Sequence, residues 1–276
     1  MTKKVKIGLC QLLVEGTEPD RNLERAVELI EEAANKKCDI ILLPETLDFA
    51  WTHPDALSEA EPIPGKYSNI LSEAAKKFNV YICAGLTEKK NGENYNTAIF
   101  IGKNGQILLK YHKINLLDVE FPYYKVGDTL NVIDTEFGKL GLNICADNYM
   151  DGLDIGHTLA RMGAQFILSP SSWTVDYSVT EEDDPYEDKW IKPYKILAEA
   201  HGITVIGTTS VGYIVGGPYE GKKMVGCSLV VDENGIKSNG DFNEFAGEVI
   251  VVDVDIKERK YKGTQIGADL QNRGYK

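Results

Sequence analysis

Short segments made almost entirely of apolar residues constrain the fold of this chain more than any other feature. Residues 40–43 read Ile-Ile-Leu-Leu, with no polar residue to mark a solvent-facing side. A strand of this kind is buried on both faces, so it requires covering layers above and below it. Strand-like segments recur along the chain, at residues 5–13, 80–86, 140–145, 164–169 and 203–209.

Amphipathic segments lie between these strands. In residues 21–37 the apolar positions have the spacing of one helical face: Leu23, Val27, Ile30 and Ala34. Asp20, just before this segment, is placed as its N-cap. Further helices are expected at residues 68–78, 155–162 and 189–201. Strands that alternate with helices predict an α/β fold in which helices cover mixed sheets.

Two dipeptides predict hairpins. Asn104-Gly105 lies between two strand-like runs, residues 95–101 and 106–111. An Asn-Gly pair in this position is a strong hairpin signal. Asn234-Gly235 lies in a second such region, bracketed by strand-like residues 224–231 and 247–254.

The charge balance excludes several classes of partner. Acidic residues outnumber basic ones by 42 to 30, for a formal charge of −12. Nucleic acids and anionic membranes both require basic patches, so we expect neither as a partner. Residues 180–188 are the most acidic stretch, and we expect them to form an exposed loop.

The cysteines indicate a reducing compartment. There are five, at positions 10, 38, 83, 145 and 227, with no CxxC pair and no clustered histidines beside them. This pattern disfavours disulfide frameworks and zinc sites. No segment has the length of a signal peptide core or approaches the roughly 20 apolar residues of a membrane helix. We therefore expect a cytoplasmic protein.

Three chemically reactive side chains each follow an apolar strand. They are Cys145 after residues 140–144, Glu45 after residues 40–44 and Lys113 after residues 107–112. A strand holds such a group rigidly, while the loop that follows gives a substrate access to it. A thiol, a carboxylate and an ammonium suffice for covalent acyl transfer. Burial should raise the pKa of Glu45, as a general base near neutral pH requires.

Each of these residues also has a purely structural interpretation. A single cysteine is most often a small buried hydrophobe, and a charged residue at a strand end is most often solvated. A cysteine–histidine pair has little support. His112 is the neighbour of Lys113 on a strand, so the two side chains point to opposite faces, and His112 would point away from a site that contains Lys113. The spacing of four residues weakly suggests a metal site: Asp147, Asp151, Asp154 and His157. Helix capping explains this spacing more simply.

Three motifs occur in a fixed order along the chain: Leu42-Leu43-Pro44-Glu45, Tyr111-His112-Lys113-Ile114 and Asn143-Ile144-Cys145-Ala146-Asp147. In this order the sequence resembles the nitrilase superfamily of carbon–nitrogen hydrolases, which use a Glu-Lys-Cys triad. Glu120 looks like a second family glutamate that lies beside the lysine. Other segments resemble the family too, at residues 5–11, 84–85, 95–98 and 226–235. The resemblance therefore covers nearly the whole chain.

The resemblance implies a four-layer α-β-β-α sandwich of two mixed sheets, in a single carbon–nitrogen hydrolase domain over residues 1–276. In the implied reaction Cys145 attacks a small amide or a nitrile, and Glu45 serves as base and then as acid while ammonia leaves and a thioester forms. Lys113 and the backbone N–H of Ala146 would stabilise the oxyanion. Glu120 would hold Lys113 in place.

The segment after Cys145 departs from the family pattern. Ala146 stands where a bulky residue is common, and Met150-Asp151 stand where a proline and a glutamate are usual. Nitrilases usually carry Cys-Trp-Glu, so Cys145-Ala146-Asp147 favours an amidase-type branch that acts on amides or N-carbamoyl compounds. Nitrile hydrolysis is the alternative. A catalytically silent binding or assembly module is the alternative of another class.

Several further expectations rest on the resemblance. Trp173 lies where the family builds a pocket wall, and it is either a substrate contact or an ordinary core aromatic. The acidic residues 181–188 are either a solvated loop or a surface that attracts a cationic substrate. We expect no cofactor and no metal. We expect a homodimer or a larger homo-oligomer, with residues 155–162 and 189–201 as candidate interface helices.

Overall fold

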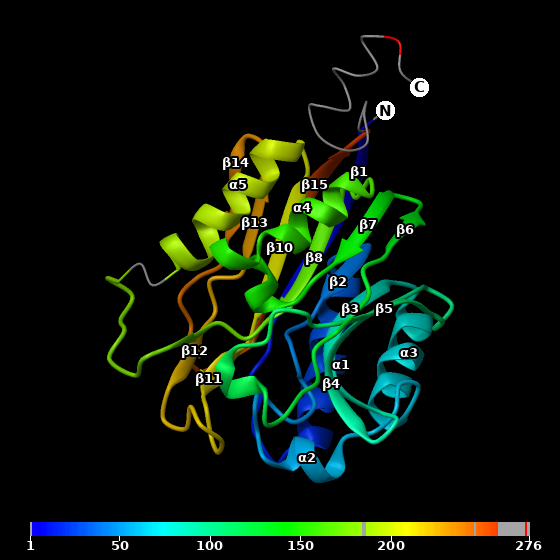
Figure 1. Cartoon of the computed structure of the whole chain (residues 1–276). Coiled ribbons are helices and arrows are strands. Elements are labelled where there is room, and N and C mark those ends of the chain that lie inside the picture. Colours follow the sequence, from blue (N-terminus) through cyan, green and yellow to red (C-terminus); the bar gives the residue numbers. More distant parts are fainter. Residues whose placement is uncertain (1, 184–185, 246, 259–273, 275–276) are drawn as a thin grey trace.

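The structure is a computed structural model that describes residues 2–183, 186–245, 247–258 and 274. Two six-stranded sheets lie face to face, and helices cover the outer face of each (Figure 1). This is the four-layer α-β-β-α arrangement that the family resemblance implies. Within the described ranges, no helix combines the length and the apolarity needed to cross a bilayer.

The N-terminal sheet has the strand order β15-β1-β2-β3-β4-β5. Its strands are β1 (Thr2–Gln11), β2 (Ile40–Leu42), β3 (Tyr81–Lys90), β4 (Glu93–Ile101), β5 (Ile107–His112) and β15 (Glu248–Lys257). Strands β1, β2 and β3 are parallel, so the chain must cross over the sheet between them. Such crossover connections usually contain a helix. The crossovers carry α1 (Pro19–Asn35), the short α2 (Asp55–Glu59) and α3 (Lys66–Phe78).

The C-terminal sheet has the order β14-β13-β10-β8-β7-β6. Its strands are β6 (Val132–Thr135), β7 (Gly138–Leu142), β8 (Phe166–Ser171), β10 (Thr204–Thr209), β13 (Leu229–Asp232) and β14 (Gly235–Asn239). Strands β7, β8 and β10 are parallel, with crossovers through α4 (Asp154–Arg161) and α5 (Lys192–His201).

A three-stranded sheet and four short helices complete the described elements. The sheet contains β9 (Thr174–Val175), β11 (Val211–Tyr213) and β12 (Lys223–Val225). The short helices are η1 (Asp118–Glu120), η2 (Cys145–Asn148), η3 (Met150–Gly152) and the π-helical turn η4 (Glu187–Ile191).

Strand β2 shows why its sequence is apolar throughout. Successive side chains on a strand point to opposite faces. Ile40 and Leu42 accordingly join the core between the two sheets, whereas Ile41 lies in the core between the N-terminal sheet and its helices. Full burial of one such side chain contributes about 1.5–3 kcal/mol.

The strand directions gather several loops at one edge of the sandwich. Strands β2, β3 and β5 of the N-terminal sheet run in one direction, and β7 and β8 are parallel in the other sheet. Across the interface, β3 packs on β8 and β1 packs on β10. Loops that leave the carboxyl ends of such strands are where α/β folds place their ligands.

The first predicted helix is correct in position but not in its cap. Helix α1 begins at Pro19 with Glu18 at the N-cap, so Asp20 lies within the first turn. Proline at the first helical position already has the φ angle of a helix, and its missing N–H would have had no partner there. The buried apolar residues of this helix are Leu23, Ala26, Ile30 and Ala33. Ala26 and Ala33 therefore take the places predicted for their neighbours Val27 and Ala34.

One predicted hairpin is confirmed, and the other is confirmed at its turn, Asn234-Gly235, but wrong in the strands predicted to flank it. Strands β4 and β5 pair antiparallel around Asn104-Gly105. Residues 224–231, predicted as one strand, form β12 and β13 in different sheets, because Gly226 and Cys227 both have positive φ and turn the chain. The hairpin at Asn234 joins β13 to β14, whereas residues 247–254 pair with β1 in the other sheet.

Candidate active site

Glu45 lies on the loop after β2, where both sheets hold its backbone. Its N–H donates to the Ser171 carbonyl at 3.3 Å, and Ser172 Oγ donates to the Glu45 carbonyl at 3.3 Å. On the other side, a Cβ added to Gly85 would lie 2.5 Å from Glu45 Cα. Only glycine fits there, so close packing of β3 and β8 against the loop fixes the position of Glu45.

The loop from Glu45 to Thr52 holds a strained backbone. Three of its non-glycine residues have positive φ: Thr46, Ala50 and Thr52. This conformation costs about 1–2 kcal/mol per residue, so the loop needs bonds from outside. The buried carboxylate of Asp48 accepts one such bond, from the N–H of Thr87 on β3 at 2.8 Å, and one within the loop, from the N–H of Phe49 at 2.9 Å. Burial raises the pKa of Asp48 to about 7.

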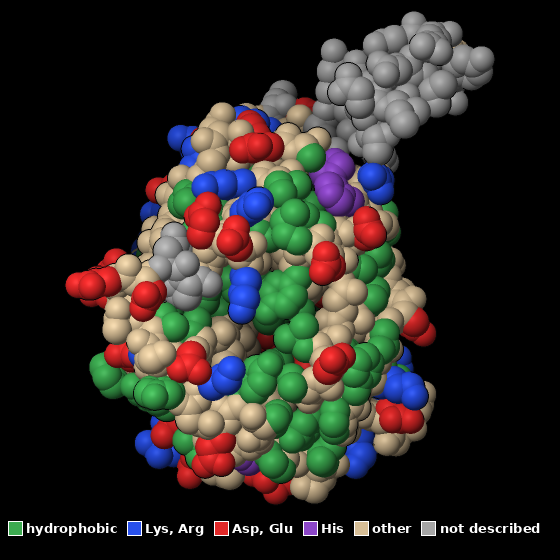
Figure 2. Space-filling view, turned by 60° about the vertical axis from the view of Figure 1, so that its left-hand side comes forward, with side chains coloured by type: hydrophobic (Ala, Val, Ile, Leu, Met, Phe, Trp, Pro, Cys, Tyr) green, Lys and Arg blue, Asp and Glu red, His purple; other side chains and the backbone are tan. Residues whose placement is uncertain are grey.

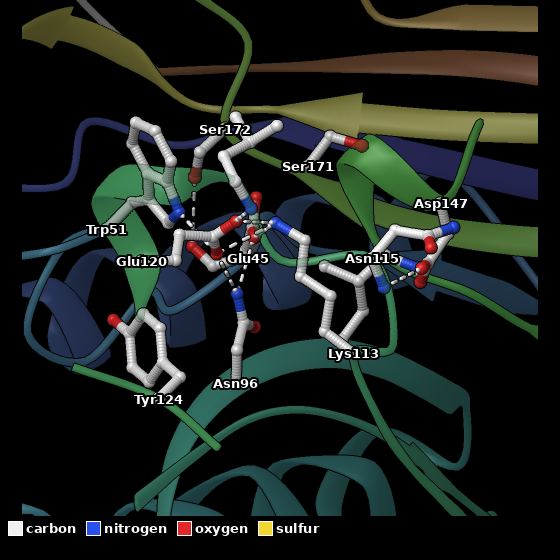
Figure 3. Close-up of polar contacts among 12 residues, drawn as sticks. Glu45, Trp51, Asn96, Lys113, Asn115, Glu120, Tyr124, Asp147, Ser171 and Ser172 are labelled. Atoms are coloured by element: carbon white, nitrogen blue, oxygen red, sulfur yellow. Dashed lines mark hydrogen bonds and ion pairs between the residues drawn. The ribbon is translucent and has the colours of Figure 1, made fainter. Parts of the chain in front are cut away.

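Lys113 follows β5 and lies at the centre of a buried ionic cluster (Figure 3). Its Nζ is 2.9 Å from Glu45 Oε1 and 2.9 Å from each carboxylate oxygen of Glu120. All three side chains are fully buried. Burial alone would lower the pKa of Lys113, but the charges of Glu120 and Glu45 outweigh it and hold that pKa well above its usual value. Lys113 is therefore a permanent ammonium.

The two carboxylates of this cluster differ in their hydrogen bonds. Besides the two bonds from Lys113, Glu120 accepts Trp51 Nε1–H at 2.9 Å on Oε1 and the Leu117 N–H at 2.8 Å on Oε2. Glu45 Oε1 accepts Lys113 and the Asn96 amide, at 2.9 and 2.6 Å. Glu45 Oε2 has no hydrogen-bond partner among the residues that the structure describes.

The electrostatic environment of Glu45 matches the sequence prediction. Burial raises its pKa, Lys113 lowers it, and the negative charge of Glu120 raises it again, with a net rise. A carboxyl group with a raised pKa and one unbonded oxygen is suited to accept and return a proton. Of the two glutamates, Glu45 therefore has the character of a base.

Cys145 does not end a strand, in contrast to the prediction. Strand β7 ends at Leu142, and Cys145 opens the turn η2 with a φ of 46°. The buried carboxylate of Asp147 fixes this turn by accepting three donors, at distances of 2.7–2.9 Å: the N–H groups of Ile144 and Asn115 and the hydroxyl of Tyr111. Burial raises the pKa of Asp147 to about 6.

The Cys145 thiol is buried and electrostatically coupled to the cluster. Burial raises its pKa well above the usual value and the charge of Glu45 raises it further, whereas Lys113 and the N–H of Ser172 lower it. The thiol is therefore neutral at rest and needs a base to become a nucleophile. The charges of Glu45 and Lys113 act on this sulfur, so the three residues of the predicted triad share one buried region.

Trp173 is buried in an aromatic cluster and also lines a cavity beside the acidic loop. Its ring stacks on Trp190 with centroids 4.6 Å apart and meets Tyr186 and Tyr194 edge-on. Trp190 in turn contacts Tyr149, which follows η2. The aromatic cluster thus packs behind the nucleophile turn and supports it. Ala146, in that turn, is also buried.

The other features singled out in the sequence lie outside the ionic cluster of Glu45, Lys113 and Glu120. His112 Nε2 lies 2.7 Å from Glu88 Oε2, on the face of β5 opposite Lys113, as strand alternation predicts. The acidic loop is exposed at residues 180–183, as expected, while Tyr186 is buried and residues 184–185 lie outside the described residues. Residues 181–183 line a cavity of about 440 Å³ together with Trp173 and Asp241.

Comparison with known proteins agrees with this geometry. A sequence profile described as carbon-nitrogen hydrolase matches residues 6–261. The chain belongs to the carbon–nitrogen hydrolase family. The family resemblance drawn from the sequence motifs is thereby confirmed.

Relatives of this carbon–nitrogen hydrolase include the omega-amidase NIT2-B of Xenopus laevis, 32% identical over 182 residues, which are 62% of this chain. The match spans 65% of the length of that relative. A nitrilase of Pyrococcus abyssi is 33% identical over 179 residues, which are 63% of this chain and 67% of that protein. In fold, the chain is similar to an amidase from Nesterenkonia sp. AN1, with a TM-score of 0.77 at 19% identity, over 91% of this chain and 93% of that one.

Sequence reasoning assigned no role to Trp51 or Asn96, which bond to the carboxylates of the buried cluster, to Ser172, which bonds to the Glu45 carbonyl, or to Asn115, which bonds to Asp147. For Asn96 a signal was available. The β4–β5 hairpin pairs Thr97 with His112, which places Asn96 beside Lys113. Trp51 and Ser172 lie in irregular segments whose course the sequence pattern does not predict.

Proposed function

We propose that this carbon–nitrogen hydrolase cleaves a non-peptide C–N bond in a small amide or N-carbamoyl compound through a thioester on Cys145. The observation that supports it most directly is the unbonded Oε2 of Glu45, in a buried cluster whose charges act on a neutral thiol. Covalent acyl transfer needs such a base for its nucleophile. The relatives named omega-amidase support an amide as the substrate class.

In the proposed first half-reaction, Glu45 accepts the thiol proton while the sulfur of Cys145 forms a bond to the amide carbon. The carbonyl electrons move to oxygen, where the Lys113 ammonium and the Ala146 N–H stabilise the negative charge. One such donor typically contributes about 10²–10³ in rate. Glu45 then gives the proton to the leaving nitrogen, the C–N bond breaks, and ammonia departs from a thioester.

Water completes the cycle. Glu45 removes a proton from a water molecule as its oxygen attacks the thioester carbon. When the tetrahedral intermediate collapses, the C–S bond breaks, and the sulfur recovers the proton from Glu45. Glu120 accepts two hydrogen bonds from Lys113 and one from the Leu117 N–H, so its role is to hold Lys113 where the oxyanion forms.

Ammonia release from a panel of ω-amides, N-carbamoyl amines and nitriles tests this proposal. We expect release from amides or carbamoyl compounds, and none with the Cys145→Ala variant. Release from nitriles alone would instead support the nitrilase alternative. One relative, from Pyrococcus abyssi, is named a nitrilase. No release from any compound would support the silent binding or assembly module. Mass spectrometry of the thioester on Cys145 would identify the acyl group.

We also propose that the chain forms a homodimer or larger homo-oligomer through the face that carries α4 and α5. Exposed methionines flank α4, with Met150 47% and Met162 36% exposed. Figure 2 shows hydrophobic side chains spread among the charged ones on this side of the molecule. Light scattering after size exclusion checks this, and a Met150→Glu/Met162→Glu variant should shift the mass towards a monomer.

A further inference from the structure

We propose that Asn96 is a positioning residue for Glu45, which it orients so that a single carboxylate oxygen, Oε2, carries out every proton transfer of the reaction. This inference rests on the proposed function, because it assigns the geometry of the same base. It adds a residue outside the Glu45, Lys113 and Cys145 triad and a distinct role for each oxygen of the base.

Asn96 contacts every charged member of the cluster. It lies on β4 and is fully buried. Its Nδ2 donates to Glu45 Oε1 at 2.6 Å and to Glu120 Oε1 at 3.3 Å. Its backbone carbonyl accepts the Lys113 N–H at 2.9 Å. One residue therefore fixes the backbone of the lysine and, through its side chain, bridges the two carboxylates; Figure 3 shows the side-chain contacts.

The orientation of the Asn96 amide is determined by its neighbours. An ionised carboxylate only accepts hydrogen bonds, so the group that faces Glu45 and Glu120 must be the donor, Nδ2. A flipped amide would place Oδ1 against two carboxylate oxygens, where lone pairs repel. In the observed orientation Oδ1 is buried and has no partner among the described residues. Such an unsatisfied group costs about 1–3 kcal/mol, so the fold retains this arrangement against its own stability.

This amide makes the two oxygens of Glu45 unequal. Oε1 accepts both Asn96 and Lys113, whereas Oε2 accepts nothing in the part of the chain that the structure describes. Rotating the carboxylate to exchange the oxygens would break both bonds in a fully buried site. The base therefore presents Oε2 alone, and the proton that leaves the thiol returns to the substrate from the same atom.

Two substitutions test the role of the Asn96 amide. Asn96→Asp keeps the size of the side chain but replaces the donor with an acceptor, and Asn96→Ala removes both. The bond from Asn96 favours the ionised form of Glu45, so its loss should raise the pKa of that carboxyl. We expect the acidic limb of the pH profile of kcat/KM to move to higher pH in both variants. We also expect kcat to fall by about 10²-fold, with little change in KM.

Thr97→Val is the matched control. Thr97 is the next residue of β4 and is equally buried, but its hydroxyl donates to Glu88 on the opposite face. Its replacement should lower the melting temperature without moving the pH profile. A purely structural role for Asn96 would give the same result in Asn96→Ala, which removes the hydrogen bond without adding a charge beside Glu45.

A second readout does not depend on turnover. The rate at which iodoacetamide alkylates Cys145, followed by peptide mass spectrometry across pH, reports proton removal from the thiol. A shift of this profile to higher pH in folded Asn96→Ala supports the positioning role, even if the wild type releases no ammonia and the proposed function fails. Wild-type profiles for both alkylation and turnover in variants that melt cooperatively would overturn it.

Discussion

Tyr111 Oη donates to Asp147 Oδ2 at 2.7 Å, and this bond joins the two sheets at the candidate site. Tyr111 belongs to β5, the strand that leads into Lys113, and Asp147 belongs to the turn that begins at Cys145. Both side chains are buried. The relative positions of the ammonium and the thiol therefore depend on a bond between two residues that take no part in the proposed chemistry.

Removing this hydroxyl should affect activity more than stability. In Tyr111→Phe, Asp147 keeps the N–H groups of Ile144 and Asn115 but loses its third donor, which costs about 1–3 kcal/mol. We expect kcat to fall by about 10²-fold as the turn shifts relative to Lys113. Tyr67→Phe, on α3 against Phe49, is the control and should retain wild-type kcat. Steady-state kinetics and urea unfolding measure both, and an unchanged kcat in Tyr111→Phe would contradict this prediction.

Replacing two buried cysteines should separate function from stability. Cys145→Ala should abolish ammonia release at a stability cost no larger than that of Cys83→Ala, because both thiols lie in the same packed core. Cys83→Ala removes a sulfur from the core between the sheets, so it should lose about 1 kcal/mol of stability and keep its activity. Turnover in Cys145→Ala, or its loss in Cys83→Ala, would refute the assignment of the nucleophile.

Lys113 should stabilise the fold as well as the oxyanion. Lys113→Met leaves the buried Glu45 and Glu120 without their shared cation, which should cost about 3–5 kcal/mol and remove activity. Adding Glu120→Gln removes one of the unpaired charges, so the double variant should recover part of this stability but no turnover. A double-mutant cycle by urea unfolding tests the coupling, and simple additivity of the two effects would exclude it.

Asp48 should give the stability a distinct pH dependence. Its pKa is about 7 when folded and about 4 in an unfolded chain, so the folded state binds the extra proton between these values. The stabilisation that comes from binding this proton in the folded state is fully present below pH ~4 and is lost as the pH rises through ~7. Asp48→Asn removes this loss, so the variant should gain on the wild type by up to about 1.4 kcal/mol per pH unit over that range. Unfolding by urea from pH 5 to pH 7.5 measures the difference.

The exposed Asp118 provides the control for this experiment. Asp118→Asn should follow the wild-type pH dependence throughout. Parallel curves for Asp48→Asn and the wild type would show that Asp48 does not bind the proton in this range.

Local signals in the sequence predicted the elements well where the structure follows local rules. The hairpin at Asn104-Gly105 and the doubly buried strand β2 depend on turn chemistry and on side-chain alternation, which act between near neighbours. The same reasoning failed at Gly226 and Cys227, because two residues with positive φ move the chain from one sheet to another. No strand pattern reveals a turn of that kind.

By itself, the sequence determined that helices cover mixed sheets, and it identified the reactive groups Glu45, Lys113 and Cys145; the family resemblance added the four layers. Only the tertiary structure decided which carboxylate has an unbonded oxygen. That choice depends on donors that come from separate parts of the chain, since Asn96 and Lys113 are 51 and 68 residues from Glu45 and reach the same oxygen. Periodicity describes neighbours along the chain, whereas hydrogen-bond partners in a buried site are selected by distance after the sheets have packed.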